Sequence, residues 1–369
     1  MQLSKVDNHR EYGLDILKVL SMLMVIGIHL VGHGGLGRAY APGSAGDWVV
    51  SLGEIAFFPA VNCFVLVSGY LLSALPFKAS RVVRVWLPAV FWSAVIQCTF
   101  FLTDQDSISL GKAVYTFLPV LSGRYWFLNA YIVMLLVSPV LNRLLRDLPR
   151  WQMFGFLVSL LAIFCISPIF SFGNDIFATQ NGYASPWFLV IYLWGGYIRF
   201  HCPKSIKLWQ PLLGYAIFVL AALLWQQFAK AVAPITMLSR LFMTYTSVPV
   251  FGAALCLLQL FRSLQFPAQI PGIRFVSALS SLSFGIYLIH DHPLIRATLL
   301  QDGFLFAGQL PWFHTLFLSM GMIITIFSLC ALLEWLRKTL FQLLRIEDTA
   351  TRLCDKLTEK AVSFLKGKL

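Results

Sequence analysis

A lysine and a histidine share one face of the first long apolar segment, residues 14–31. Lys18 and His29 are eleven residues apart, which places them within about 20° of each other around an α-helix and roughly 16 Å apart along its axis. A charge inside a membrane-spanning helix costs roughly 2.5–3.5 kcal/mol, so it needs a partner or a function. His29 could act as a general base on a hydroxyl, because imidazole titrates near neutrality, and Lys18 could hold an anion.

The neighbours of these two residues extend the polar face. Asp15 lies three residues before Lys18 and could pair with it, and His33 follows His29 by one helical turn. Each residue also has a structural explanation, because Lys18 could snorkel to lipid phosphates and His29 could form a hydrogen bond across helices. Two such residues in register favour a polar track along the helix.

A second basic pair precedes the third apolar segment. Arg81 and Arg84 are three residues apart at the start of a predicted helix, so they project together where backbone N–H groups also favour phosphate. The pair therefore indicates a site for a multiply phosphorylated ligand. The alternative is that these arginines only orient the chain in the membrane.

Further polar and aromatic residues stand at the ends of later segments. They are Ser68-Gly69-Tyr70 at the end of the second segment, Trp126 at the start of the fourth, and Tyr287 with His290 on one face of the ninth. Close helix packing at the glycine and anchoring of the aromatic rings at the membrane interface are alternatives to a chemical role.

These residues must be positioned by membrane-spanning helices. Of the 369 residues, 58% are apolar and only 12% are charged, against roughly a quarter charged in soluble domains. Apolar runs near 20 residues can each cross a hydrocarbon core of roughly 30 Å as a helix. We predict an all-α, polytopic integral membrane protein with about ten transmembrane helices in one bundle, at residues 14–31, 55–75, 82–102, 126–144, 154–170, 187–200, 212–228, 241–260, 275–289 and 313–336.

The basic residues alternate with the predicted spans. Counted from the N-terminus, the odd-numbered gaps hold 21 lysines and arginines and the intervening gaps hold 6. This bias predicts that both termini are cytoplasmic, and it explains the net charge of +12 by membrane orientation, without nucleic-acid binding. No small-residue cleavage site follows the first span, so we expect it to be retained.

We expect no appended soluble domain, because no gap between the predicted spans exceeds about 25 residues. Seven cysteines are scattered singly, without a Cys-x-x-Cys pair or a Cys/His cluster, so they indicate neither a disulfide framework nor a metal site. Residues 341–369 alternate apolar and basic side chains, which predicts an amphipathic tail helix on the anionic cytoplasmic leaflet. A tail that is merely solvated is the alternative.

Taken in order, these segments resemble the acyltransferase-3 family of bacterial membrane acyltransferases. The run 14–18 (Leu-Asp-Ile-Leu-Lys), followed ten residues later by His29, is similar to the family's opening Leu-Asp-x-Leu-Arg and histidine, with lysine in place of arginine. Further stretches resemble other motifs of the family. They are the runs 64–72, 125–128 and 287–290 and the element Arg81-x-x-Arg84-x-x-x-Pro88. The resemblance extends from the first predicted span through the ninth.

The resemblance implies that residues 1–340 form an O-acetyltransferase of the bacterial inner membrane. Its expected donor is cytoplasmic acetyl-coenzyme A or another short acyl-coenzyme A, and its acceptor is a hydroxyl of a cell-envelope polysaccharide or a lipid-linked glycan precursor. The donor would contact Lys18, Arg81 and Arg84. His29 would be the base, with Tyr287 or His290 donating to the oxyanion, or it would carry the acyl group covalently. Substrate contacts would come from Ser68, Tyr70 and Trp126, and no metal is expected.

Three other functions fit the same sequence features. An acyltransferase for a different group, such as succinyl, would use the same residues. A membrane transporter or flippase of lipid-linked glycans would also need a polar track through the bundle, although the sequence has no visible internal repeat. The third is a non-catalytic scaffold in the assembly of glycans. Loss of export would indicate the transporter, whereas exported but unmodified glycan would indicate the enzyme.

Overall fold

The computed structural model describes residues 10–103, 110–204, 206–232, 236–267 and 269–366, and these residues contain helices but no strand. Short 3₁₀ or π turns lie at Leu36–Arg38, Ala162–Ile166, Gln180–Gly182, Arg296–Leu300 and Leu305–Gln309. The α-helices are α1 (Tyr12–Gly32), α2 (Ala45–Phe57), α3 (Ala60–Leu72), α4 (Ser80–Leu102), α5 (Leu110–Phe117), α6 (Trp126–Asp147), α7 (Arg150–Leu161), α8 (Ser167–Phe170), α9 (Ser185–His201), α10 (Trp209–Val232), α11 (Thr236–Ser239), α12 (Val248–Ser263), α13 (Ile273–Ser280), α14 (Ser283–His290), α15 (Pro293–Ile295), α16 (Trp312–Leu343) and α17 (Ile346–Lys366).

The helices are long and apolar enough for a polytopic membrane protein. Among the described residues, seven candidate spans reach the required length, with α2 and α3 counted as one span from Ala45 to Leu72. An eighth is the pair α13 and α14, which is bent by 48°. The predicted fold class is therefore confirmed, but the predicted count of about ten is not, because α9 and α12 have only 17 and 16 residues.

Three predicted spans differ from the helices that form. The second starts at Ala45 instead of residue 55, because the Ser44 hydroxyl caps the helix by accepting a hydrogen bond from the Asp47 N–H. Residues 241–247 are turns, and α12 begins only at Val248, where Pro249 suits the first helical turn. The ninth span is divided into α13 and α14. Hydropathy detects the apolar run in each case but not the local hydrogen bonds that set its ends.

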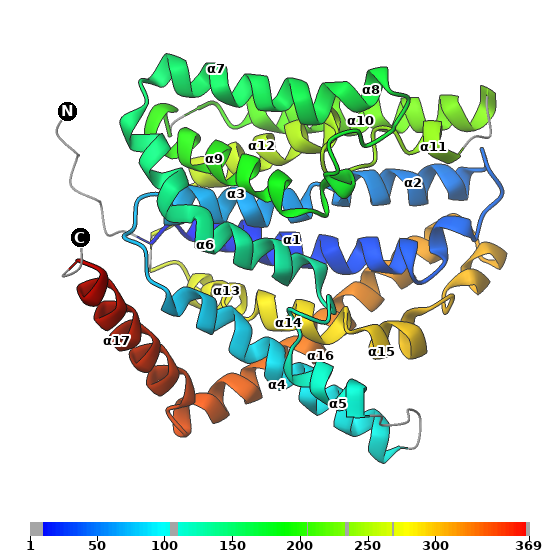
Figure 1. The fold of residues 1–369 in the computed structure, drawn as a ribbon. Coiled ribbons are helices and arrows are strands. Elements are labelled where there is room, and N and C mark those ends of the chain that lie inside the picture. Colours follow the sequence, from blue (N-terminus) through cyan, green and yellow to red (C-terminus); the bar gives the residue numbers. More distant parts are fainter. Residues whose placement is uncertain (1–9, 104–109, 205, 233–235, 268, 367–369) are drawn as a thin grey trace.

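Helix α1 lies in the middle of the bundle (Figure 1). It contains both Lys18 and His29. It packs against α2, α3, α12, α13, α14 and α16. The start of α1 and the end of α17 lie at the same end of the bundle, on the left in Figure 1. The polar face of α1 is therefore enclosed by other helices along its length.

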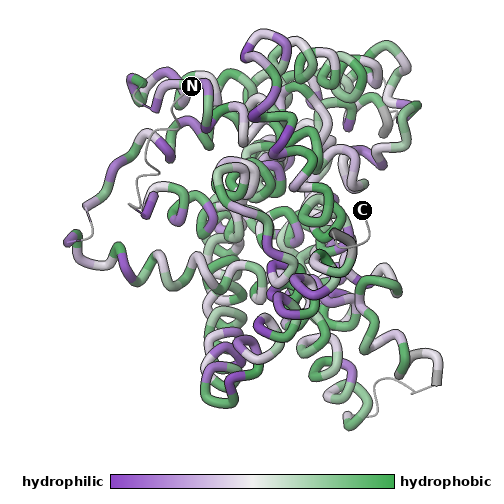
Figure 2. Tube along the Cα trace, turned by 60° about the vertical axis from the view of Figure 1, so that its left-hand side comes forward, coloured by the Kyte–Doolittle hydropathy of each residue, from purple (hydrophilic) through white to green (hydrophobic). Residues whose placement is uncertain are grey.

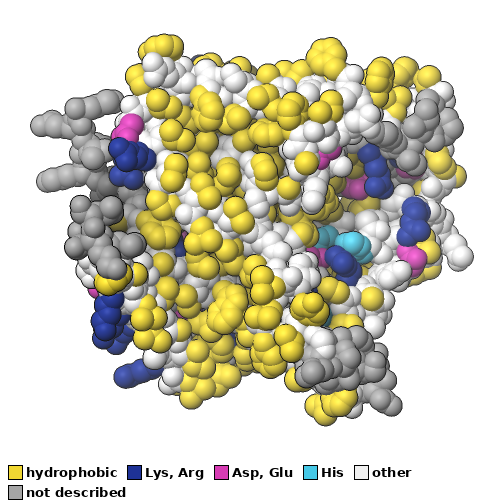
Figure 3. All heavy atoms as spheres, in the orientation of Figure 1, with side chains coloured by type: hydrophobic (Ala, Val, Ile, Leu, Met, Phe, Trp, Pro, Cys, Tyr) yellow, Lys and Arg dark blue, Asp and Glu magenta, His cyan; other side chains and the backbone are white. Residues whose placement is uncertain are grey.

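The outer surface of the bundle is apolar. In α7–α8 only 17% of the residues of the apolar window are buried, against 61% in α1, so α7–α8 is peripheral and α1 is interior. Hydrophobic residues follow most of the helices in Figure 2, and hydrophobic side chains form a broad field in Figure 3, with lysines and arginines mainly near its two ends. This distribution is that of an integral membrane protein.

The C-terminal tail forms a helix, as its apolar pattern predicts. Helix α16 extends to Leu343, three residues past the predicted boundary at residue 340, and α17 begins at Ile346. Helix α17 packs along α4, where the Ser80 hydroxyl lies 3.1 Å from a carboxylate oxygen of Asp355. Leu353 and Leu357 remain 58% and 59% exposed, which leaves an apolar face available for the lipid surface.

Candidate functional site

A cavity of about 630 Å³ follows the polar face of α1 through the bundle. Lys18 lines it toward the start of α1, His29 lies farther along, and His33 lines it past the end of that helix. The expectation that Lys18 and His29 share one face is confirmed. In Figure 3, histidine side chains lie in a hollow beside acidic and basic groups, on the right of the view. The cavity can therefore hold a polar ligand deep in an otherwise apolar bundle.

His29 and His290 form the centre of this site. The Nδ1 atom of His29 lies 3.1 Å from Nε2 of His290, and Nδ1 of His290 lies 2.7 Å from the carbonyl oxygen of Ile286. Because a carbonyl only accepts, His290 carries its proton on Nδ1 and its Nε2 accepts from His29. This network assigns the neutral His29 tautomer, with the proton on Nδ1 and a lone pair on Nε2. His29 thus has the form that a general base requires.

An acidic side chain lies next to the histidine pair. A carboxylate oxygen of Asp291 is 3.7 Å from Nδ1 of His29 and 3.1 Å from a guanidinium nitrogen of Arg296. The carboxylate would stabilise a positive charge on His29 after it accepts a proton. His29, His33 and Asp291 also present ligand atoms within 4.8 Å of one another, a set that could coordinate a divalent cation.

Helix α14 places His290 by packing tightly on α16. A Cβ atom at Gly285 would lie only 2.0–2.3 Å from the Glu334 side chain, so no larger residue fits there. Glu334 is fixed by hydrogen bonds from the Trp92 indole at 2.7 Å and from Arg337 at 2.7 and 2.9 Å. These three side chains are buried. The polar cluster therefore sets the position of α14, whose last residue is His290.

Tyr287 presents its hydroxyl to the same region. The residue lines the cavity, and its ring packs against Tyr125 and Phe127. Its buried hydroxyl lies beside Asp291 but makes no hydrogen bond of normal geometry within the described residues. A buried hydroxyl without a partner is costly, so a ligand in the cavity would be its natural acceptor.

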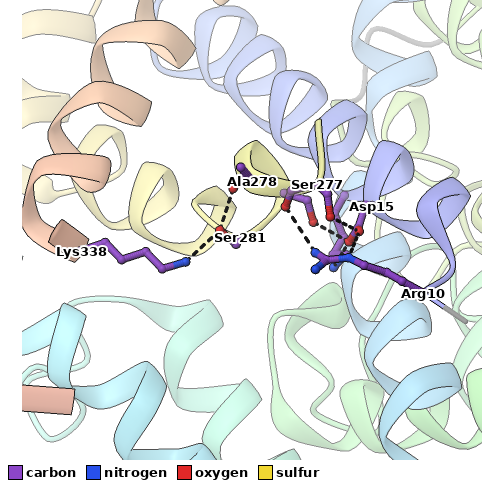
Figure 4. Close-up of polar contacts among 8 residues, drawn as sticks. Arg10, Asp15, Ser277, Ala278, Ser281 and Lys338 are labelled. Atoms are coloured by element: carbon purple, nitrogen blue, oxygen red, sulfur yellow. Dashed lines mark hydrogen bonds and ion pairs between the residues drawn. The ribbon is translucent and has the colours of Figure 1, made fainter. Parts of the chain in front are cut away.

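Lys18 belongs to a cluster centred on Asp15 at the other end of the cavity. Figure 4 shows Asp15 with Arg10 and Ser277. The Lys18 ammonium lies 2.8 Å from Asp15, and Arg10 contacts the second carboxylate oxygen at 2.7 Å. The hydroxyls of Ser277 and Ser280 also donate to Asp15, at 2.7 and 2.9 Å. The predicted Asp15–Lys18 pair is therefore present. The two serine hydroxyls join Asp15 of α1 to α13.

The arginine pair expected at the phosphate site lies outside the cavity wall. Arg81 donates to the Pro76 carbonyl oxygen at 2.7 Å, and Arg84 lies 3.8 Å from Glu347 of α17. From this part of α4 only Val85 lines the cavity. The structure does not bring the two arginines together with Lys18, because their helix turn faces the chain segment before α4 and the tail helix.

The three residues expected to contact substrate separate into two groups. Ser68 and Trp126 line the cavity, where the Ser68 hydroxyl lies 3.0 Å from that of Tyr131. Tyr70 does not line it. The Tyr70 ring is buried beneath the Arg199 guanidinium, 5.0 Å from its centre, which suits a structural role.

The far end of the cavity contains residues that the sequence analysis did not assign. They are Glu54, Asn181, Tyr183, Arg240, Tyr245 and Arg296. Arg240 and Arg296 are two of the six basic residues counted above in the intervening gaps between predicted spans. The tyrosines and Asn181 gave no periodic signal, because they lie in loops. Aromatic rings next to polar groups are suited to binding a sugar.

One of these loops has an unusual backbone. Ala178, Gln180 and Asn181 have positive φ values of 51°, 51° and 57°. Asp175 holds the loop by accepting hydrogen bonds from the backbone N–H groups of Thr179 and Asn181. Such strain is concentrated at functional sites, and here it presents Asn181 to the cavity. The Asn181 carbonyl oxygen also accepts from the Tyr245 N–H at 3.1 Å, which fixes a second lining residue.

Comparison with known proteins identifies a family. The sequence model of an acyltransferase domain matches residues 11–332, which is most of the chain. The match begins just before α1 and ends within α16, so it includes every residue of the cavity wall. No curated protein and no solved structure matches the chain.

Proposed function

The chain belongs to the acyltransferase-3 family, and from this premise we propose that it transfers an acetyl or other short acyl group from cytoplasmic acyl-coenzyme A to a glycan hydroxyl. The acceptor is a cell-envelope polysaccharide or its lipid-linked precursor. The observation that carries the proposal is the position of His29, in the cavity between a cationic end and an aromatic, polar end. Two substrates can reach one base from opposite sides.

The two ends of the cavity suit different substrates. Lys18 and its neighbours offer positive charge, which favours the phosphates of coenzyme A. At the other end, Trp126 stacks on Tyr245 with ring centres 5.8 Å apart, and Tyr183 lies 4.4 Å from Trp126. Ring faces of this kind can pack against a sugar, while Asn181 and Glu54 also line this end and can bind hydroxyls.

The chemistry follows from the tautomer of His29. Its Nε2 lone pair takes the proton of the acceptor hydroxyl as the oxygen attacks the thioester carbonyl. Tyr287 donates a hydrogen bond to the oxyanion that forms. Collapse of the intermediate breaks the carbon–sulfur bond, and His29 returns the proton to the coenzyme A thiolate. The new ester and free coenzyme A are the products, and no other reactant is consumed.

The distribution of basic residues supports a different side of the membrane for each substrate. The 21-to-6 distribution of basic residues supports cytoplasmic termini and a bacterial inner-membrane location. Lys18 then faces the cytoplasm, where acyl-coenzyme A is available. His33 and Arg296 face the opposite side, where a glycan precursor would be modified.

The test is the acetyl content of surface glycan in a deletion strain that carries plasmid copies of the gene. We expect wild type to restore acetylation and His29→Ala to lower it at least about a hundredfold, because a general base typically contributes 10²–10⁴-fold. His314, an exposed histidine outside the cavity, gives the matched control His314→Ala. NMR of the glycan measures the result, with variant levels checked by immunoblot. Normal acetylation by His29→Ala would contradict the proposal, and loss of glycan export would indicate a transporter.

A further inference from the structure

The break between α13 and α14 opens into the cavity. The two helices meet at an angle of 48°, and Ser281 and Leu282 connect them. Ser280, Ser281 and Ser283, all at this break, line the cavity on the side of Lys18. Broken membrane helices commonly bind ions through backbone groups that a continuous helix would pair.

The start of α14 has no side-chain cap. Its N-cap residue, Leu282, supplies no side-chain acceptor. Backbone hydrogen bonds at the break include those from the N–H groups of Ser281, Leu282 and Ile286. The N–H groups of Ser283, Phe284 and Gly285 belong to the first turn of α14, where a helix provides no carbonyl of its own to accept from them. Uncapped N–H groups and the positive end of the helix dipole favour an anion.

A buried hydroxyl at the same point also lacks a partner. Ser283 is only 3% exposed, lines the cavity, and its Oγ atom makes no hydrogen bond within the described residues. Leaving a buried hydroxyl unpaired is unfavourable. This observation is independent of the helix end, and both point to the same missing acceptor.

Two lysines flank the break. Lys338 of α16 donates to the Ser281 hydroxyl at 2.9 Å. Lys18 pairs with Asp15, which also accepts a hydrogen bond from the adjacent Ser280. Figure 4 shows Lys338 extending from one side of the break and the Arg10–Asp15 contact on the other. Arg10 and Lys18 contact the carboxylate of Asp15, and Lys338 adds a third cation on the other side of the break, so these four side chains carry a net positive charge.

We propose that the break between α13 and α14 binds a phosphate group, and that in the working enzyme this phosphate belongs to the acyl donor. The N–H groups of the first turn of α14 and the Ser283 hydroxyl are the donors, and Lys18 and Lys338 are the flanking cations. The assignment to the acyl donor rests on the proposed function.

The site also relates the donor to the catalytic base. Helix α14 has eight residues, so it extends about 12 Å from the phosphate site to His290. Its positive end faces the phosphate, and its negative end faces the histidine pair, where positive charge develops on proton uptake. One short helix therefore holds the donor's phosphate at one end and the partner of the base at the other.

The experiment measures coenzyme A binding to the purified full chain in phosphatidylcholine nanodiscs by titration calorimetry. We expect Kd to rise about tenfold in Lys338→Gln, as for loss of a charge-assisted hydrogen bond. Ser283→Ala should raise Kd about threefold, and Lys338→Arg should bind as wild type does. Lys207→Gln, an exposed lysine in the loop before α10, is the matched control. Thermal unfolding of each variant verifies that it is folded. Unchanged Kd in both Lys338→Gln and Ser283→Ala would overturn the proposal.

Two further arms identify the source of the phosphate. Inorganic pyrophosphate should compete with coenzyme A in wild type and compete about tenfold less well in Lys338→Gln. If phosphatidylglycerol in the nanodisc displaces coenzyme A, the site holds a lipid headgroup and the assignment to the donor is wrong. If wild type binds pyrophosphate at the break but not coenzyme A, the proposed function fails while the anion site stands. If His29→Ala abolishes acylation but the break variants bind coenzyme A normally, only the anion site fails.

Discussion

The Nδ1 atom of His29 lies 3.1 Å from the Nε2 atom of His290, although 261 residues separate them in the chain. Because His290 also contacts the Ile286 carbonyl oxygen, the pair has a defined direction, with each Nδ1 donating. The Nε2 atom of His29 is thereby left unprotonated. The tautomer of the proposed base is set by a residue on another helix.

Replacement of His290 should lower kcat without weakening donor binding. In His290→Ala the proton of His29 loses its acceptor, so the two neutral tautomers become mixed and fewer molecules hold a free Nε2. We expect kcat to fall about tenfold or more, with KM for acyl-coenzyme A unchanged. His290→Asn, whose side-chain oxygen can accept from His29, should recover part of the rate. Steady-state kinetics on the purified enzyme measure both, and equal loss in the two variants would argue against a positioning role.

Tyr287→Phe should also act on kcat. The variant keeps the ring packing against Tyr125 and Phe127 and removes only the hydroxyl that would donate to the oxyanion. Loss of one such donor costs about a hundredfold or more in kcat. Tyr215→Phe is the control, because the Tyr215 hydroxyl donates to the Ala56 carbonyl oxygen outside the cavity. A kcat within twofold of wild type in Tyr287→Phe would assign the oxyanion to another donor.

Lys18 should tolerate arginine but not glutamate. Lys18→Arg keeps the charge beside Asp15 and is expected to remain active. The native Lys18 ammonium lies 2.8 Å from Asp15, so Lys18→Glu places two carboxylates next to each other. Both carboxylates then repel the phosphates of the donor. Coenzyme A binding measures the effect, with a rise in Kd of about tenfold or more expected. Normal binding by Lys18→Glu would exclude Lys18 from the donor site.

Removal of divalent cations should leave the activity unchanged. His29, His33 and Asp291 could coordinate a metal ion, but then His29 could not serve as the free base. Dialysis against a chelator followed by an acyl-transfer assay separates these roles. Activity that disappears with the chelator and returns with zinc would assign the three residues to a metal site and contradict the proposed mechanism.

Gly69→Ala should destabilise the bundle. A Cβ atom at Gly69 would lie 2.2 Å from the Tyr192 carbonyl oxygen, and one at Gly195 would lie 2.3 Å from that of Leu66. Helices α3 and α9 therefore approach through glycines, and overpacking costs about 1–3 kcal/mol. Gly321→Ala, with no atom within 4 Å of its added Cβ, is the matched control and should be neutral or slightly stabilising. Thermal unfolding in detergent compares them, and equal melting temperatures would contradict the packing explanation.

The sequence determined the membrane class and the polar face of α1. Both follow from local rules, because a helix of apolar residues must satisfy its own backbone in lipid and its 3.6-residue period aligns Lys18 with His29. The same period identified Asp15 as the partner of Lys18. Closely spaced residues on one helix can be related without knowledge of any other helix.

The tertiary structure alone decided which helices complete the site. The His29–His290 pair and the approach of Lys338 to Ser281 join residues that are far apart in the chain. It also placed Arg81, Arg84 and Tyr70 outside the lining of the cavity, although their motifs resemble those of the family. Contacts between helices depend on how side chains pack across the bundle, and no local pattern encodes that packing. The break in the ninth span shows the same limit, because hydropathy is continuous where the helix is interrupted.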